Sequence, residues 1–150
     1  MGCQQRIDNK IVKHFTQCSK SEKELIAKKL HNITKVSGIS KHAKKDHTDR
    51  MKERTGETVE NFVPYINTML HNIDNIKEVT VKGKNRVRVL MKSKFTLKGK
   101  NGKEFYLCFV VSLDMGNLVT VIPVPVEDRN YKEAPFKPYY KKFNVAEYIH

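Results

Sequence analysis

The chain has 150 residues, 39% of them hydrophobic and 30% charged, and its 29 Lys and Arg outnumber 16 Asp and Glu to give a formal net charge of +13. This length suffices for one domain with its own core and is too short for two independent domains. The composition excludes a collagen, and no apolar run approaches the roughly 20 residues of a membrane span. Because Met1–Phe15 lacks the apolar stretch of a signal peptide, we expect a cytoplasmic protein without a membrane partner.

The excess of positive charge predicts a polyanionic partner. Basic domains of this size most often neutralise phosphates, so RNA or another nucleic acid is the first candidate. An acidic protein, such as an immunity or antitoxin protein or a host protein, is the second candidate. The alternative is that the lysines only keep the protein in solution. Lys dominates the excess over Arg, which favours diffuse contacts to phosphate over bidentate recognition.

The cysteines predict neither a disulfide framework nor a metal site. There are three of them, Cys3, Cys18 and Cys108, and no two form a C-x-x-C pair. An odd number without that spacing argues against structural zinc. Cys108 lies in the apolar run Phe105–Val111 and is expected to behave as a small buried hydrophobic side chain. We therefore expect no metal and no cofactor.

The first half of the chain has the periodicity of helices. The first helix is expected over Gln4–Gln17, where apolar side chains recur along one stripe. Ser21 and Glu24 form an S-x-x-E capping box that would open the second helix. Ser40 suits the N-cap of a third, very polar helix, and Thr58 starts a fourth.

The strand Arg86–Lys92 has the clearest pattern in the chain. Its residues alternate, so one face is apolar and the other carries charge. Val87, Val89 and Met91 share the first face, and Arg86, Arg88, Leu90 and Lys92 share the second. Phe95–Lys98 is expected to continue this strand.

Turn signals separate the remaining strands. Asn101–Gly102 is a strong two-residue hairpin signal, and Phe105–Leu113 and Leu118–Ile122 follow as strands. The predicted fold is one α+β domain over residues 1–150, with N-terminal helices packed on a roughly four-stranded antiparallel meander. Its parts are a mainly helical region (1–75), the antiparallel sheet (77–128) and a Tyr- and Lys-rich C-terminal tail (129–150).

The polar segment Ile39–Arg50 holds the candidate catalytic histidines. His42 and His47 would lie roughly 140° apart around a helix, which does not suit a two-histidine metal site. Cleavage of RNA without a metal needs a base for the 2′-hydroxyl, an acid for the leaving oxygen and cations for the charge on phosphorus. Histidine suits the first two roles, and Lys or Arg suits the third. A histidine-bearing helix end over the charged face of Arg86–Lys92 would supply all three.

The same residues also have a purely structural interpretation. Lys41–His47 is typical of a solvated helix face, and Arg86 and Arg88 are typical of the wet side of a half-buried strand. Thr120 lies among Val and Ile in a strand, where β-branched residues are common in any sheet. Tyr106 could stack on a base or simply pack. Composition and spacing leave both interpretations open.

The order of motifs carries a family resemblance. Gly38–Met51 reads GISKHAKKDHTDRM, a later helix ends in HNIDNIKEV, and strands rich in Lys and Arg follow. This order resembles the phage-associated and toxin nucleases of the barnase–EndoU–colicin–RelE superfamily. Members often show a short S-x-x-x-x-H-x-x-x-R-H-like helix, a second helix leading into I-x-N-P-D-x-I, and four strands. The counterparts here are His42 and His47, then Asn72–Ile76, then the strands within Glu78–Ile122, so the resemblance covers about residues 38–125.

The resemblance implies a small, metal-independent ribonuclease, toxin-like or phage-encoded. His42 would be the first acid or base and His47 the second, while Thr120 would orient the substrate or donate a hydrogen bond. The predicted catalytic residues are therefore His42, His47, Arg88 and Thr120, and the predicted phosphate-binding residues are Lys41, Lys44, Lys45, Arg86 and Lys92. The alternatives are a non-catalytic nucleic-acid-binding protein and a phage-type inhibitor module that docks its basic face on an acidic protein.

Overall fold

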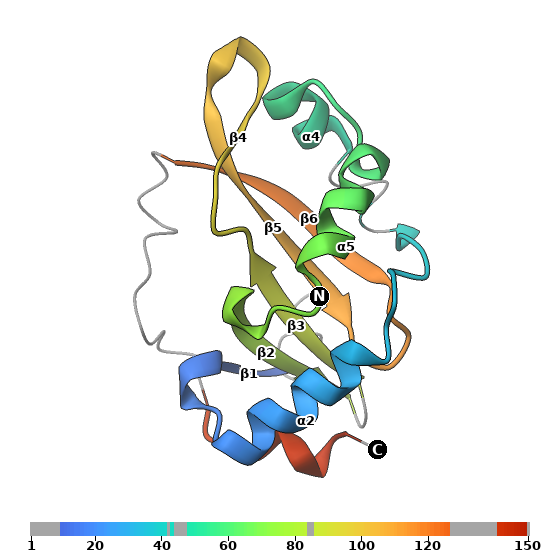
Figure 1. Cartoon of the computed structure of the whole chain (residues 1–150), viewed down its shortest axis with the longest axis vertical. Coiled ribbons are helices and arrows are strands. Elements are labelled where there is room, and N and C mark those ends of the chain that lie inside the picture. Colours follow the sequence, from blue (N-terminus) through green and yellow to red (C-terminus); the bar gives the residue numbers. More distant parts are fainter. Residues whose placement is uncertain (1–9, 42, 44–47, 84–85, 127–140, 150) are drawn as a thin grey trace, which may run out of the picture.

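Six antiparallel strands form one sheet (Figure 1). The computed structural model describes the chain except residues 1–9, 42, 44–47, 84–85, 127–140 and 150. The strands are β1 (Lys10–His14), β2 (Ile76–Lys82), β3 (Arg86–Lys92), β4 (Leu97–Lys98), β5 (Glu104–Ser112) and β6 (Leu118–Pro125). The order of neighbouring strands is β1, β2, β3 and β5. Strand β6 pairs with the other edge of β5. Because β4 and β6 both pair with Phe105, β4 lies on the β3 side of β5.

Helices cover one face of this sheet (Figure 1). The α-helices are α2 (Lys20–His31), α4 (Thr48–Thr55) and α5 (Val63–Met69). The 3-10 helices are η1 (Phe15–Gln17), η2 (Val59–Phe62), η3 (Ile73–Asn75), η4 (Lys100–Gly102) and η6 (Val145–Glu147). The mixture of helices and an antiparallel sheet confirms the predicted α+β class, although the sheet gains β1 and the short β4 beyond the expected meander.

The predicted N-terminal helix over Gln4–Gln17 is wrong in its described part. Lys10–His14 forms β1, and only the short η1 follows it. The spacing of Ile11 and Val12 fits a strand as well as a helix, and β-branched residues pack well in a sheet. The deciding factor is β2, against which β1 pairs from Lys10 to His14. That partner lies far along the chain, so local periodicity could not reveal it.

Helix α2 begins two residues earlier than its predicted capping box. The N-cap is Ser19, whose Oγ accepts a hydrogen bond from the Glu22 amide at 3.2 Å, while the Ser19 amide donates to Glu22 Oε1 at 2.8 Å. Ser21 and Glu24 are exposed instead. Both pairs fit the S-x-x-E pattern, so the sequence alone cannot choose between them.

The two other predicted helix starts are confirmed. Ser40 Oγ accepts a hydrogen bond from the Ala43 amide at 3.1 Å, as an N-cap does. Thr58 is the N-cap residue of η2, which leads directly into α5.

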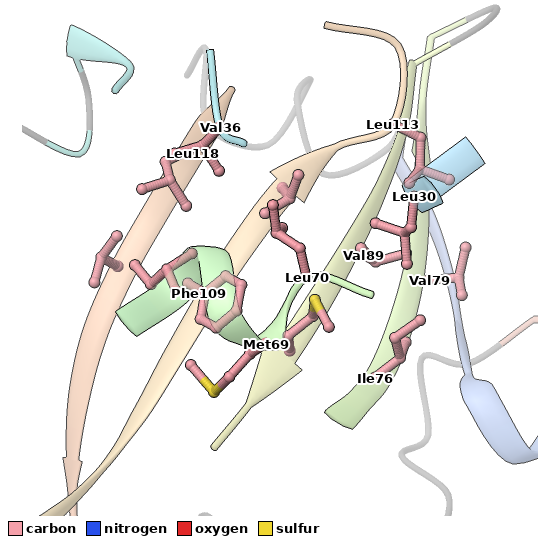
Figure 2. Packing of buried hydrophobic residues seen from close by; sticks show 14 of the residues in the cluster. Leu30, Val36, Met69, Leu70, Ile76, Val79, Val89, Phe109, Leu113 and Leu118 are labelled. Atoms are coloured by element: carbon pink, nitrogen blue, oxygen red, sulfur yellow. The ribbon is translucent and has the colours of Figure 1, made fainter. Parts of the chain in front are cut away.

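The core lies between the sheet and these helices (Figure 2). From the sheet, Val79, Val89 and Phe109 are fully buried. Leu30 of α2 and Leu70, directly after α5, lie over them and are also fully buried. Removing a large buried side chain of this kind typically costs about 3–5 kcal/mol, so this packing holds the helices on the sheet.

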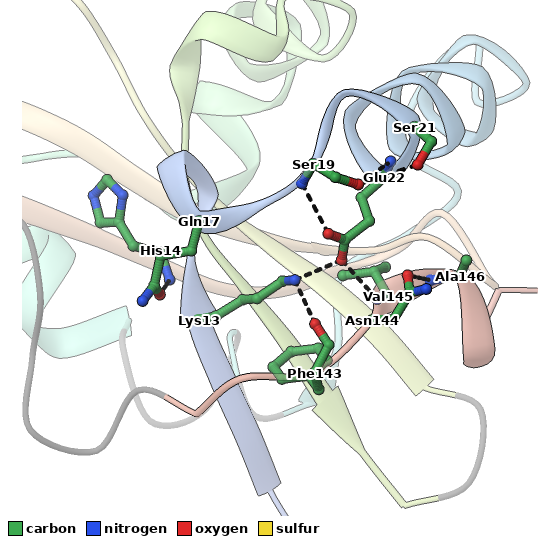
Figure 3. Close-up of polar contacts among 10 residues, drawn as sticks. All are labelled: Lys13, His14, Gln17, Ser19, Ser21, Glu22, Phe143, Asn144, Val145 and Ala146. Carbon is green, nitrogen blue, oxygen red and sulfur yellow. Dashed lines mark hydrogen bonds and ion pairs between the residues drawn. The ribbon is translucent and has the colours of Figure 1, made fainter.

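A buried ion pair joins β1 and the segment around Phe143 and Val145 to α2 (Figure 3). Lys13 Nζ lies 2.5 Å from Glu22 Oε2 and donates a second hydrogen bond to the Phe143 carbonyl oxygen. The Val145 amide also donates to Glu22 Oε2, at 2.7 Å. The side chains of Lys13 and Glu22 are only 4% and 7% exposed. The described end of the predicted tail is therefore fastened to β1 and α2, while residues 129–140 lie outside the described part of the chain.

The strand predicted over Phe95–Lys98 is shorter than expected. Only Leu97–Lys98 pairs with β5, as β4, and the residues just before it leave the ladder. The predicted hairpin after it is confirmed, since η4 connects β4 to β5 and Gly102 has a φ of 73°. A positive φ is easily adopted by glycine, which explains the Asn-Gly signal at this turn.

Candidate nucleic-acid interface

Strand register decides which side chains share the sheet face opposite the helices. Residues directly opposite each other in an antiparallel pair point to the same face. Val87, Val89 and Met91 are fully buried on the helix side. Their alternating neighbours therefore lie on the other face: Arg86, Arg88, Leu90 and Lys92. This confirms the predicted division of the Arg86–Lys92 strand into an apolar and a charged side.

Neighbouring strands extend this second face on both sides. On β2, Lys82 pairs with Arg86 and Thr80 pairs with Arg88. On β5, Ser112 pairs with Arg88 and Cys108 pairs with Lys92. We call the surface defined by Lys82, Arg86, Arg88 and Lys92 the basic face. It is not uniformly positive, because Glu78 pairs with Leu90 on the same side of the sheet.

Arg88 is the cation of the basic face whose pKa is clearly perturbed. Its side chain is half-buried, and burial followed by the positive charge of Arg86 lowers its pKa below the usual value for arginine. Both causes disfavour the charged guanidinium, so the site would gain from a negative charge placed beside it. Two adjacent arginines on one strand face are thus preorganised for an anion.

Lys92 has an aromatic partner on the next strand. Its Nζ lies 4.3 Å from the centroid of the Tyr106 ring, in the geometry of a cation–π contact. The Tyr106 ring that we considered for base stacking therefore already carries an ammonium group on one face. This contact holds the Lys92 ammonium over Tyr106 of β5.

Cys108 pairs with Lys92 in the sheet and carries a buried thiol. Burial raises the pKa of its thiol to about 11, although Lys92 and Lys77 act in the opposite direction. The thiol is therefore protonated at neutral pH, and only the thiolate reacts readily. Cys108 is 2% exposed and acts as a packing residue, as the sequence predicted.

The structure brings some of the predicted site residues together and separates others. Arg86, Arg88 and Lys92 share one strand face, whereas Thr120 lies on β6, opposite Val110 of β5. Thr120 is on the same side of the sheet, but β5 separates it from Arg88 by about two strand spacings, roughly 10 Å. The described residues therefore do not join Arg88 and Thr120 in one contact.

The predicted histidine segment starts at the outer edge of β6. The Ser40 amide donates to the Leu118 carbonyl and Ser40 Oγ donates to the Val119 carbonyl, each at 2.8 Å. Lys41 follows as an exposed helical residue. The other predicted residues of this segment lie outside the described part of the chain: His42, Lys44, Lys45 and His47.

One member of the basic face and one cation near it were missed from the sequence. Lys82 joins it because it pairs with Arg86, and Lys77 acts electrostatically on Cys108 from the start of β2. Neither has a local signal, since their positions follow from the register of β2 and from the register shift between Ile76 and Glu78. A correct pairing of β2 with β3 would have been enough to find Lys82.

Other kinds of site and relationship were also sought. Among the described residues, no group of three or more His, Cys, Asp and Glu side chains lies close enough together to hold a metal ion. Within that same part of the chain, no helix has the length and apolar character needed to cross a membrane. No family model, curated protein or solved structure matches the chain.

Proposed function

We propose that this protein binds nucleic acid, and RNA in the first place, across the basic face of its sheet. The observation that supports this most is the pair Arg86 and Arg88, which lie on one strand face with Arg88 half-buried. Phosphate would neutralise charges that the fold holds close together, and it would accept hydrogen bonds from both guanidinium groups. The net charge of +13 adds a long-range attraction for any polyanion.

The spacing of the basic face suits a nucleic-acid strand. Side chains on one face of a β-strand recur every 6.5–7 Å or so. Arg86 and Arg88 are one such repeat apart on β3, and Lys92 follows two repeats after Arg88 because Leu90 stands between them. That repeat is about twice the 3.4 Å rise per nucleotide of one strand in a duplex. A backbone running along β3 could therefore meet successive cations without large distortion.

Loss of both arginines is expected to weaken RNA binding by about a hundredfold or more, because charge-assisted hydrogen bonds contribute roughly 1.5–3 kcal/mol each and about 1.4 kcal/mol corresponds to a factor of ten. The variant is Arg86→Gln/Arg88→Gln, and the measurement is fluorescence anisotropy with a labelled single-stranded RNA at several salt concentrations. The slope of log affinity against log salt should also fall by about 1.4, since each lost phosphate contact on a single strand contributes about 0.7.

A matched control removes the same charge elsewhere. Lys20→Gln/Lys28→Gln lowers the net charge equally on α2, where both lysines are exposed on the helix side of the molecule. An equal loss of affinity in the two variants would contradict a specific interface on the basic face. A folded wild-type protein that binds no RNA would instead favour an acidic immunity, antitoxin or host protein as the partner.

Ribonuclease activity is the second candidate, and the contact of Ser40 with β6 favours it. That contact ties the start of the histidine segment to the strand that carries Thr120, within the sheet that carries Arg88.

We expect the purified protein to cleave total RNA with EDTA present. His42→Ala is expected to slow cleavage by about a hundredfold or more, as loss of an acid or base does. Gel analysis of both proteins measures this. Cleavage that is unchanged in His42→Ala would refute the role of that residue, and no cleavage by the wild type would leave binding alone.

A further inference from the structure

A bulge between β3 and β4 holds an aromatic side chain in solvent. The Ser93 amide donates to the Leu107 carbonyl at 2.9 Å, and Leu97 pairs with Phe105. Three residues, 94 to 96, therefore stand opposite the single residue 106 of β5. Phe95 lies in the middle of these three and is 76% exposed.

Internal hydrogen bonds maintain the bulge. Ser93 is 2% exposed, and its Oγ accepts a hydrogen bond from the Leu107 amide at 3.0 Å. The same hydroxyl donates to the Phe95 carbonyl oxygen at 2.9 Å. One buried side chain thus replaces a ladder contact and fixes the backbone of Phe95. Bulges of this kind often redirect a side chain beside a functional site.

Three lysines lie near Phe95 in the chain. Lys92, Lys94 and Lys98 lie within three residues of it on either side. The bulge stands opposite Tyr106, the residue whose ring carries Lys92 Nζ. Lys94 lies 3.8 Å from Asp74, in an ion pair in which both side chains are largely exposed. Phe95 therefore has an exposed ring three residues beyond Lys92, the last residue of the basic face.

We propose that Phe95 stacks on a base of a single-stranded nucleic acid whose phosphates follow the basic face. This inference rests on the proposed function and narrows its ligand to single strands. An exposed ring among lysines is the combination that binds single strands, because unpaired bases offer their faces and phosphates meet the cations. The bases of a duplex are already stacked on one another, so a duplex would offer Phe95 no free face.

The test compares ligands with and without bases. Affinity is measured by anisotropy for a labelled single-stranded RNA and by competition for inorganic polyphosphate, which has phosphates only. Phe95→Ala is expected to weaken single-stranded RNA binding by about tenfold, in the range found for loss of one stacked base. Its affinity for polyphosphate should stay at the wild-type value. Phe95→Trp should bind RNA as the wild type does, because tryptophan also offers an aromatic ring. Phe95→Leu should bind as weakly as Phe95→Ala, because leucine is apolar but has no ring.

The outcomes separate this inference from the proposed function. If Phe95→Ala binds RNA as well as the wild type while Arg86→Gln/Arg88→Gln does not, stacking is refuted and the basic face stands. Equal losses for RNA and polyphosphate, or a duplex of the same sequence that binds as tightly as the single strand, would also refute it. A wild type that binds no RNA would overturn both. Phe95 is exposed, so the melting temperatures of Phe95→Ala, Phe95→Trp and Phe95→Leu are expected to match the wild type.

Discussion

Glu22→Gln is expected to lower the free energy of unfolding by about 3–5 kcal/mol, because it leaves the Lys13 ammonium buried without a carboxylate. The Lys13 side chain is 4% exposed, and its other hydrogen-bond acceptor is the Phe143 carbonyl oxygen. Urea unfolding followed by circular dichroism measures the change. Glu24→Gln is the matched control, since Glu24 lies exposed on the same helix and should change stability by less than about 0.5 kcal/mol.

A second substitution identifies the cause of the loss. Lys13→Met in the Glu22→Gln background removes the unpaired charge. The Gln side chain keeps one oxygen, which can accept from only one of the two amides, Ser19 or Val145, that donate to separate oxygens of Glu22. The double variant should therefore be more stable than Glu22→Gln alone, because a buried pair can often be replaced by neutral groups at little cost. If the double variant is less stable than the single one, lost packing of Lys13 rather than its charge decides the effect.

The contribution of the Lys13–Glu22 pair to the free energy of unfolding should decrease as the pH falls. Burial would raise the pKa of Glu22, but the hydrogen bond from Lys13 and those from the Ser19 and Val145 amides outweigh it, so its pKa is lowered from the model-compound value of 4.5. The unfolded state then binds more protons than the folded state below pH 4.5. The stabilisation is complete above that pH and is lost as pH falls through the folded value. The stability difference between the wild type and Glu22→Gln should narrow over that window.

The parts of the fold that were predicted correctly are those with local causes. The alternation along Arg86–Lys92 reflects a two-residue period that any half-buried strand needs, and the Asn101–Gly102 turn reflects the backbone freedom of glycine. β1 was missed because its cause is distant. Ile11 and Val12 become a strand only when β2 offers its edge.

The candidate site divides in the same way. Arg86, Arg88 and Lys92 were placed on one face correctly, because alternation alone determines that. Lys82 required the register between β2 and β3, which no local pattern encodes. Phe95 was predicted as a strand residue, and the bulge that exposes it depends on the buried Ser93 hydroxyl, whose partner Leu107 lies on another strand. The alternating pattern was therefore misleading at this bulge.

Arg88→Met is expected to change stability and RNA affinity in opposite directions. The substitution keeps an unbranched side chain on β3 and removes a half-buried charge that burial and Arg86 both disfavour. The lowered pKa of Arg88 means that its charged form is less favourable in the folded state than in the unfolded state. Removing the charge should therefore raise the melting temperature.

The same change should weaken binding of single-stranded RNA by about tenfold, since one charge-assisted contact to phosphate is lost. Thermal melting and anisotropy on one preparation measure both quantities, and Arg86→Met is the internal comparison, because Arg86 is exposed and its removal should affect affinity more than stability. A residue whose role is structural should stabilise the folded protein. A residue whose role is to bind a ligand can lower the stability of the ligand-free protein. Arg88→Met that melts below the wild type and binds RNA normally would assign Arg88 to the fold. Arg88→Met that melts above the wild type and binds RNA more weakly would identify the basic face as a binding surface whose charge is compensated by its ligand.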